Sequence, residues 1–216
     1  ILLTDAANNL ILITLDIAGF VVALKAEDDA IANRIVSRYR DFLSTEKSSL
    51  LEINIISIPG ARFIELKPGP WVIEAKFDDG HLSYQSYLER AEVDFNSGRG
   101  TLEMAPDANI ENFLRTVLAW LSINNEAVLL HAAGVIRNGV GYVFFGPSGS
   151  GKTTTSRIAS RIADVVSDDL VIIRLEDGIV RLYGVPFRGE ISEAPRANQN
   201  APIRAIFRLR QDTEHY

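Results

Sequence analysis

The chain has 216 residues, of which 47% are hydrophobic, and a net charge of −6 at pH 7. This much apolar surface excludes a disordered tail, and the acidic balance argues against nucleic-acid binding, which requires a basic face. The absence of cysteine excludes disulfides, thiolate zinc sites and a catalytic thiol, and is compatible with a cytoplasmic protein.

The first half of the chain, residues 1–105, predicts a smaller α+β module. Apolar runs over residues 10–15 and 20–24 predict two strands. They lie in the longest apolar stretch of the chain, which polar residues interrupt and which is too short to span a bilayer. We therefore expect a strand pair here and no membrane partner.

A helix and a sheet are expected in the rest of this module. Asp28 or Asp29 can cap a helix that runs to about Phe42, with apolar residues at helical spacing on its inner face. Apolar and polar residues then alternate over residues 51–55 and part of 71–77, and turn residues punctuate the intervals. The pattern predicts a meandering antiparallel sheet with one helix.

The second half, residues 106–216, begins with a predicted helix over residues 109–121 that joins the two modules. Two apolar strands are then expected over residues 128–136 and 141–145. The Asn-Gly pair between them is a strong tight-turn signal, so we expect the two strands to form an antiparallel hairpin.

The sequence GPSGSGKT over residues 146–153 matches G-x-x-x-x-G-K-[ST], the pattern of a phosphate-binding loop. It follows a strand and precedes a helical pattern up to Ala163, which is the required order. Its glycines let successive N–H groups turn inward around a polyphosphate at a helix N-terminus, while Lys152 suits the β- and γ-phosphates and the Thr153 hydroxyl suits Mg²⁺. Unless the match arises by chance in a glycine-rich turn, the chain binds a nucleotide through Gly146, Pro147, Ser148, Gly149, Ser150, Gly151, Lys152, Thr153 and Thr154.

Two carboxylates, Asp168 and Asp169, follow the loop closely. The intervening helix leaves just enough chain to return and begin a strand, whose end is expected to bring both carboxylates near the loop. One can hold Mg²⁺ while the other accepts a proton from an attacking hydroxyl. The alternative is an ordinary Asp-Asp turn after a strand.

His131 lies on the first strand of the predicted hairpin, whose second strand runs into the loop. A histidine there can lie beside the γ-phosphate or the acceptor and donate a hydrogen bond. Equally, it can be a half-buried side chain with structural partners.

Three motifs together resemble the catalytic domain of HPr kinase/phosphorylase and the wider group of HPr-kinase-like P-loop proteins. They are HAAGV at residues 131–135, the glycine loop, and VSDD at residues 166–169. The loop is also similar to that of ATP-dependent phosphoenolpyruvate carboxykinase. The resemblance covers about residues 131–210 and implies an α/β P-loop kinase-like domain that transfers a phosphoryl group from ATP to a hydroxyl.

The resemblance also implies roles for individual residues. Lys152 and Thr153 would act on nucleotide and metal, Asp168 and Asp169 as metal partner and base, and His131 as a residue of the site.

The downstream part departs from the family. The bifunctional enzyme carries a Glu-Ile-Arg-Gly-type signature, whereas this chain has GVPFRGE over residues 184–190. Arg188 and Glu190 can supply a comparable positive charge and a metal-linked carboxylate, or form a solvated surface pair; Arg196 and Arg204 are weaker candidates. A C-terminal substrate-binding segment is expected to be missing, so we expect an acceptor other than HPr.

The sequence thus predicts an ATP- and Mg²⁺-dependent phosphotransferase acting on a serine-like hydroxyl of a protein, peptide or small molecule. Two alternatives stay open. One is a nucleotide-binding regulatory protein or slow NTPase without kinase activity; the other is a carboxykinase-like enzyme acting on a small acid, for which no convincing set of extra basic residues is found. Self-association of the chain is also left open.

Overall fold

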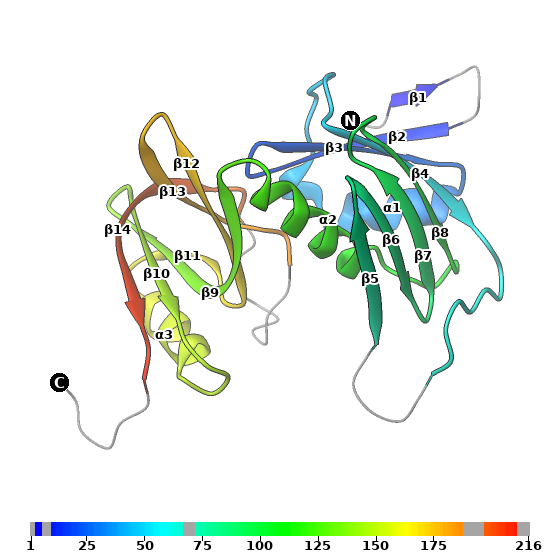
Figure 1. The fold of residues 1–216 in the computed structure, drawn as a ribbon. Helices are drawn as coiled ribbons and strands as arrows, with labels where there is room; N and C mark the ends of the chain where they lie inside the picture. The colour runs from blue at the N-terminus through cyan, green and yellow to red at the C-terminus, as the bar shows by residue number, and fades with distance from the viewer. Residues whose placement is uncertain (1–2, 6–9, 67–71, 188–196, 211–216) are drawn as a thin grey trace. The chain divides into compact units, whose positions relative to one another are not determined.

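A computed structural model of the chain divides into two compact units, Ile1–Thr116 and Val117–Tyr216 (Figure 1). Both units are mixed α/β, and most of their secondary structure is strand. The division falls within the helix α2 (Glu111–Ile123), whereas the boundary expected from the sequence, residues 105–106, precedes that helix. The residues that the structure describes are 3–5, 10–66, 72–187 and 197–210.

The first unit holds an eight-stranded sheet in the order β1-β2-β3-β4-β8-β7-β6-β5. The expected antiparallel meander is wrong at its centre, because β3 pairs with β4 and β4 with β8 in parallel. The reason is that a helix, α1 (Asp29–Arg38), connects β3 to β4, and that three successive hairpins bring β8 back beside β4. The strands are β1 (Leu3–Asp5), β2 (Leu10–Ile17), β3 (Phe20–Ala26), β4 (Leu51–Ser57), β5 (Ile73–Asp78), β6 (His81–Ser86), β7 (Glu89–Asp94) and β8 (Arg99–Met104).

The helix α1 (Asp29–Arg38) begins as expected. The Asp28 carboxylate caps it by accepting hydrogen bonds from the N–H groups of residues 30 and 31, at 2.8 and 3.1 Å. The expected end near Phe42 is wrong by about one turn. A 3₁₀ turn, η1 (Arg40–Phe42), follows instead, and its tighter hydrogen bonding still buries Phe42.

In its described residues, the second unit contains six strands, the C-terminal part of α2 and the helix α3 (Lys152–Ala159). Besides the order β10-β14-β13-β12-β9-β11, β9 also pairs with β10, so that β9, β10, β14, β13 and β12 form a closed ring of pairings. Among the pairings of the described strands of this unit, only that of β10 with β14 is parallel. The strands are β9 (Ala127–Arg137), β10 (Val140–Phe145), β11 (Asp164–Ser167), β12 (Leu170–Glu176), β13 (Ile179–Tyr183) and β14 (Asn200–Arg208).

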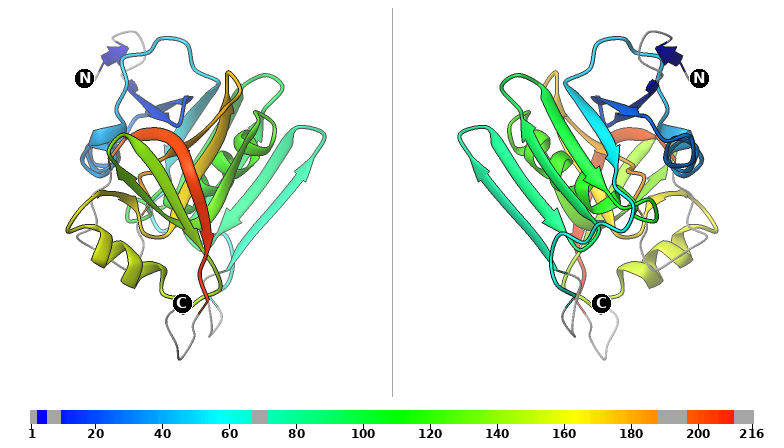
Figure 2. Two further views of the ribbon diagram at one scale, coloured as in Figure 1. Left: turned by 90° about the vertical axis from the view of Figure 1, so that its left-hand side faces the viewer. Right: turned by 90° about the vertical axis from the view of Figure 1, so that its right-hand side faces the viewer.

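The predicted hairpin is confirmed. Asn138 and Gly139 connect β9 to β10 with φ values of 52° and 76°, as a two-residue turn of type I′ requires. The helix α3 packs against β9, β10 and β11 (Figure 2) but ends four residues before the expected Ala163. Hydrogen bonds of the tighter i→i+3 kind follow Ala159 and turn the chain into β11.

The interior of the second unit is packed around Gly134 on β9. A Cβ added there would lie 2.8 to 3.0 Å from the side chains of Val171, Leu182 and Val166, which are fully buried.

Within the described part of the chain, no helix is both long and apolar enough to cross a membrane.

Candidate active site

The glycine loop joins β10 directly to α3, so the expected order of strand, loop and helix is confirmed. Gly149 and Gly151 have φ values of +78° and +101°, which side chains with a Cβ rarely adopt. Gly146 is needed for a different reason, because a Cβ there would lie 2.6 Å from the Ser150 Oγ and 2.8 Å from the Leu209 carbonyl oxygen. The three glycines therefore allow both the path of the loop and its close packing.

Lys152, the first residue of α3, points back into the loop. Its Nζ donates hydrogen bonds to the carbonyl oxygens of Gly146 and Pro147, at 2.9 and 3.0 Å, and the residue is buried. The ammonium group is thus fixed beside the loop, next to the N-terminus of a helix. Both features favour negative charge at this place.

The Asp168-Asp169 pair lies where two strands meet. β11 and β12 both run antiparallel to β9, with Ser167 opposite Gly134 and Leu170 opposite His131, so the two aspartates occupy the break between them. The Asp169 carbonyl accepts a hydrogen bond from the Ala132 N–H at 2.9 Å, which holds the break against β9. This arrangement fixes the backbone of Asp168 and Asp169 relative to β9, the strand that carries His131.

Ser167 supports this break and was not a candidate from the sequence. Its Oγ accepts hydrogen bonds from the N–H groups of Asp169 and Leu170, at 3.4 and 3.3 Å. A serine followed by two aspartates is a recognisable turn-forming sequence, and this was the signal available.

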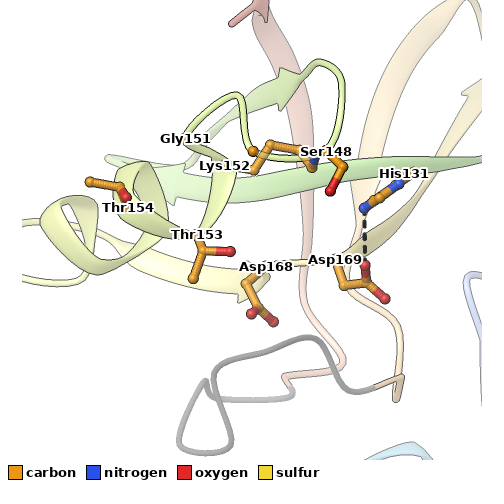
Figure 3. A pocket seen from close by; sticks show the side chains of 9 residues that line it. His131, Ser148, Gly151, Lys152, Thr153, Thr154, Asp168 and Asp169 are labelled. Carbon is orange, nitrogen blue, oxygen red and sulfur yellow. Dashed lines mark ion pairs between the residues drawn. The ribbon is translucent and has the colours of Figure 1, made fainter. Parts of the chain in front are cut away.

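One cavity of about 410 Å³ brings the candidates together (Figure 3). At its wall, the His131 Nε2 and the Asp169 Oδ1 are 3.1 Å apart, and the two side chains point toward one another. Asp168 is 4% exposed, whereas the His131 side chain is 58% exposed. The lining residues, all of which were candidates, are His131, Ser148, Gly149, Gly151, Lys152, Thr153, Thr154, Asp168 and Asp169.

Other candidates lie elsewhere. Gly146, Pro147 and Ser150 build the loop without lining the cavity, and Arg204 is exposed on β14. Arg188, Glu190 and Arg196 lie outside the described residues.

The side chains at the cavity suit a metal ion that is also coordinated by a phosphate. They do not suit a metal ion that is coordinated by protein side chains alone. Among the residues described, no group of three or more His, Cys, Asp or Glu side chains is arranged to hold a metal ion. Mg²⁺ typically takes one or two carboxylates and completes its shell with water and substrate phosphate oxygens. Thr153 and Asp168 both offer oxygen to the cavity and therefore fit Mg²⁺ of this kind.

Searches with the chain found no matching protein-family model and no matching curated protein. The resemblance to HPr-kinase-like proteins therefore rests on the three motifs themselves.

Proposed function

We propose that the protein is an ATP- and Mg²⁺-dependent phosphotransferase with a P-loop kinase-like second domain, related to the HPr-kinase-like proteins, and that its acceptor is a hydroxyl group. The observation that carries this proposal is the shared cavity. A glycine loop with the sequence pattern of phosphate-binding loops, a helix N-terminus, two carboxylates and a histidine all line one space of about 410 Å³. A simple nucleotide-binding loop needs neither the second carboxylate nor the histidine.

The loop side of the cavity is suited to hold the nucleotide. The N–H groups of the loop and of the first turn of α3 would surround the β- and γ-phosphates, with Lys152 as the nearest cation. Bound Mg²⁺ would neutralise phosphate charge, and Thr153 and Asp168 are the side chains that would hold it. Asp168 suits this role because a buried carboxylate is stabilised by a cation beside it.

The opposite side of the cavity is suited to the acceptor. We assign the base to Asp169, whose carboxylate is 25% exposed and therefore reachable. It would take the proton of the acceptor hydroxyl while that oxygen attacks the γ-phosphorus and the bond to the β-phosphate oxygen breaks, releasing ADP. His131 would orient the Asp169 carboxylate through their 3.1 Å contact.

The two aspartates give a sharp test, because the proposal assigns them different roles. Asp169→Asn should retain Mg²⁺-dependent binding of ATP and lose transfer of labelled γ-phosphate to serine-containing proteins and peptides or small alcohols. Asp168→Asn should lose both transfer and the Mg²⁺ dependence of binding. Lys152→Ala serves as the reference for lost nucleotide binding.

The alternatives correspond to other outcomes of the same assay. ATP binding without transfer to any acceptor class would overturn the kinase and favour a regulatory protein or slow NTPase. Nucleotide-dependent conversion of a small dicarboxylic acid would favour the carboxykinase-like alternative.

A further inference from the structure

The strand β5 (Ile73–Asp78) is the last strand of the first unit's sheet. Among the described strands it pairs only with β6, and all six of its residues are exposed. Both views of Figure 2 show it as the outermost strand of its own sheet. Its pairing with β6 is regular, without a bulge or proline, so it lacks two of the features that commonly protect edge strands from pairing.

The two faces of β5 differ in chemistry. Ile73, Ala75 and Phe77 lie on the same face as Leu82 and Tyr84 of β6, which are buried. Yet Ile73 and Phe77 are 40% and 37% exposed, so the apolar face of the sheet reaches water at this strand. A charged side chain on the apolar face is another common feature that protects an edge strand from pairing. β5 has no charged side chain on that face.

The opposite face of β5 carries three charges in the order Glu74, Lys76, Asp78. The Glu74 carboxylate accepts a hydrogen bond from the Gln85 amide at 2.7 Å, and the Lys76 Nζ lies 3.6 Å from the Asp78 carboxylate. The Lys76 and Asp78 side chains are both more than three-quarters exposed, at 79% and 77%.

The turn between β5 and β6 determines which backbone groups face the open edge. Asp79 and Gly80 form a two-residue loop with φ values of 44° and 77°. In such a hairpin the flanking pair, Asp78 and His81, is hydrogen-bonded, and bonded pairs then alternate along the strands. The N–H and C=O groups of Lys76 therefore face β6, and those of Ala75 face outward.

This alternation limits how a second β5 can pair antiparallel with the first. Outward-facing residues must lie opposite outward-facing residues, so Ala75 lies opposite its own equivalent or a residue two or four positions away. In the first register, Glu74 lies opposite Lys76 of the partner subunit, twice by symmetry. A shift of two residues instead places Lys76 opposite Lys76, or Glu74 opposite Glu74, of the partner subunit. A shift of four residues brings Lys76 opposite Asp78 of the partner subunit, but it leaves only residues 76–78 of each strand paired. Opposite charges across a strand pair stabilise it and like charges destabilise it, so charge and the length of the paired segment together select the first register.

We propose that β5 is a self-association edge and that its occupant is a second copy of this chain. Two β5 strands pair antiparallel about a two-fold axis at Ala75, and the two sheets become one. The apolar residues Ile73 and Phe77 of opposite subunits then lie across from each other, and two Glu-Lys contacts form on the other face. The contact is isologous, as a closed dimer requires, and it is independent of phosphoryl transfer.

Charge reversal tests this pairing in the full chain. By sedimentation velocity, the wild type should be a dimer in the micromolar range, and Glu74→Lys or Lys76→Glu should each weaken the dimer by about tenfold or more, because both contacts become repulsive. A one-to-one mixture of these two variants should form a heterodimer, and the double exchange should restore the homodimer. A monomeric wild type, or single variants that dimerise as well as the wild type, would overturn the proposal.

A cross-link tests the register independently. The chain has no cysteine, so Ala75→Cys introduces a single thiol at the two-fold axis. Equivalent Cα atoms there should be about 5.5 Å apart, within the range of a disulfide, and mild oxidation should give a covalent dimer. In the control Asp78→Cys the two thiols are separated by about 20 Å and should remain unlinked. Equal cross-linking of both variants would contradict the register.

Discussion

Glu89 is a buried carboxyl whose ionisation should be visible in the stability of the protein. It begins β7 and is 3% exposed. Its Oε2 accepts hydrogen bonds from the Tyr84 hydroxyl at 2.9 Å and from the Ser86 hydroxyl at 3.0 Å. Among the described residues, its buried Oε1 has no hydrogen-bond partner. Burial is the largest influence and raises the pKa of Glu89 from 4.5 to about 7, while the two hydroxyls act in the opposite direction.

The sign of the pH effect follows from which state holds the proton. Between pH 4.5 and 7 the folded protein keeps the Glu89 proton, whereas the unfolded chain has lost it. The free energy of unfolding therefore has its full Glu89 contribution below pH 4.5 and loses it as the pH rises to about 7. Each unit by which the folded-state pKa of Glu89 exceeds its unfolded value corresponds to ~1.4 kcal/mol. The free energy of unfolding should therefore fall by about 3 kcal/mol over this range.

Glu89→Gln isolates this contribution. The glutamine carbonyl oxygen can still accept from both hydroxyls, but the side chain cannot ionise. Urea denaturation at a series of pH values should show the variant gaining about 3 kcal/mol on the wild type between pH 4.5 and 8. The control is Glu92→Gln on the same strand, since Glu92 is exposed and accepts a hydrogen bond from the Ser83 hydroxyl. Identical pH profiles for wild type and Glu89→Gln would refute the reasoning.

Three smaller substitutions test the packing and the local signals by the same denaturation measurement. Gly134→Ala should cost about 1–3 kcal/mol, because its Cβ would lie 2.8 Å from Val171 and 3.0 Å from Leu182; an unchanged midpoint would mean that the core can shift. Gly139→Ala should cost about 1 kcal/mol through its φ of +76° alone, since nothing lies within 4 Å, and a cost of about 3 kcal/mol would contradict this. Asp28→Ala should cost about 1 kcal/mol by removing the cap of α1, whereas Asp28→Asn should be nearly neutral.

The predictions that were confirmed concern elements whose determining residues lie close together in the chain. Asp28 caps α1, Asn138 and Gly139 turn the β9–β10 hairpin, and residues 146–153 connect a strand to a helix. Each depends on backbone preferences and hydrogen bonds within a few residues, which the sequence states directly. The ends of α1 and α3 were placed one turn too late, because the tighter turns that end them do not interrupt the apolar pattern.

The sequence named the candidate residues but not their geometry. His131, Lys152, Asp168 and Asp169 line one cavity, and the contact between His131 and Asp169 depends on β12 pairing with β9. Ser167, which supports the aspartates, was not named from its turn-forming sequence and is identified by its hydrogen bonds.

The sequence by itself determined the glycine loop between β10 and α3, the cap of α1 and the tight turns, because these arise from residues that are neighbours in the chain. Only the tertiary structure decided that β3, β4 and β8 run parallel, that five strands of the second unit pair in a ring, and that β5 is left at an edge. Strand partners are chosen among segments distant in sequence, by which apolar faces can be buried together and which connections can reach. That choice gathers the loop, the histidine and the two aspartates around one cavity, and it leaves the alternating charges of β5 facing water.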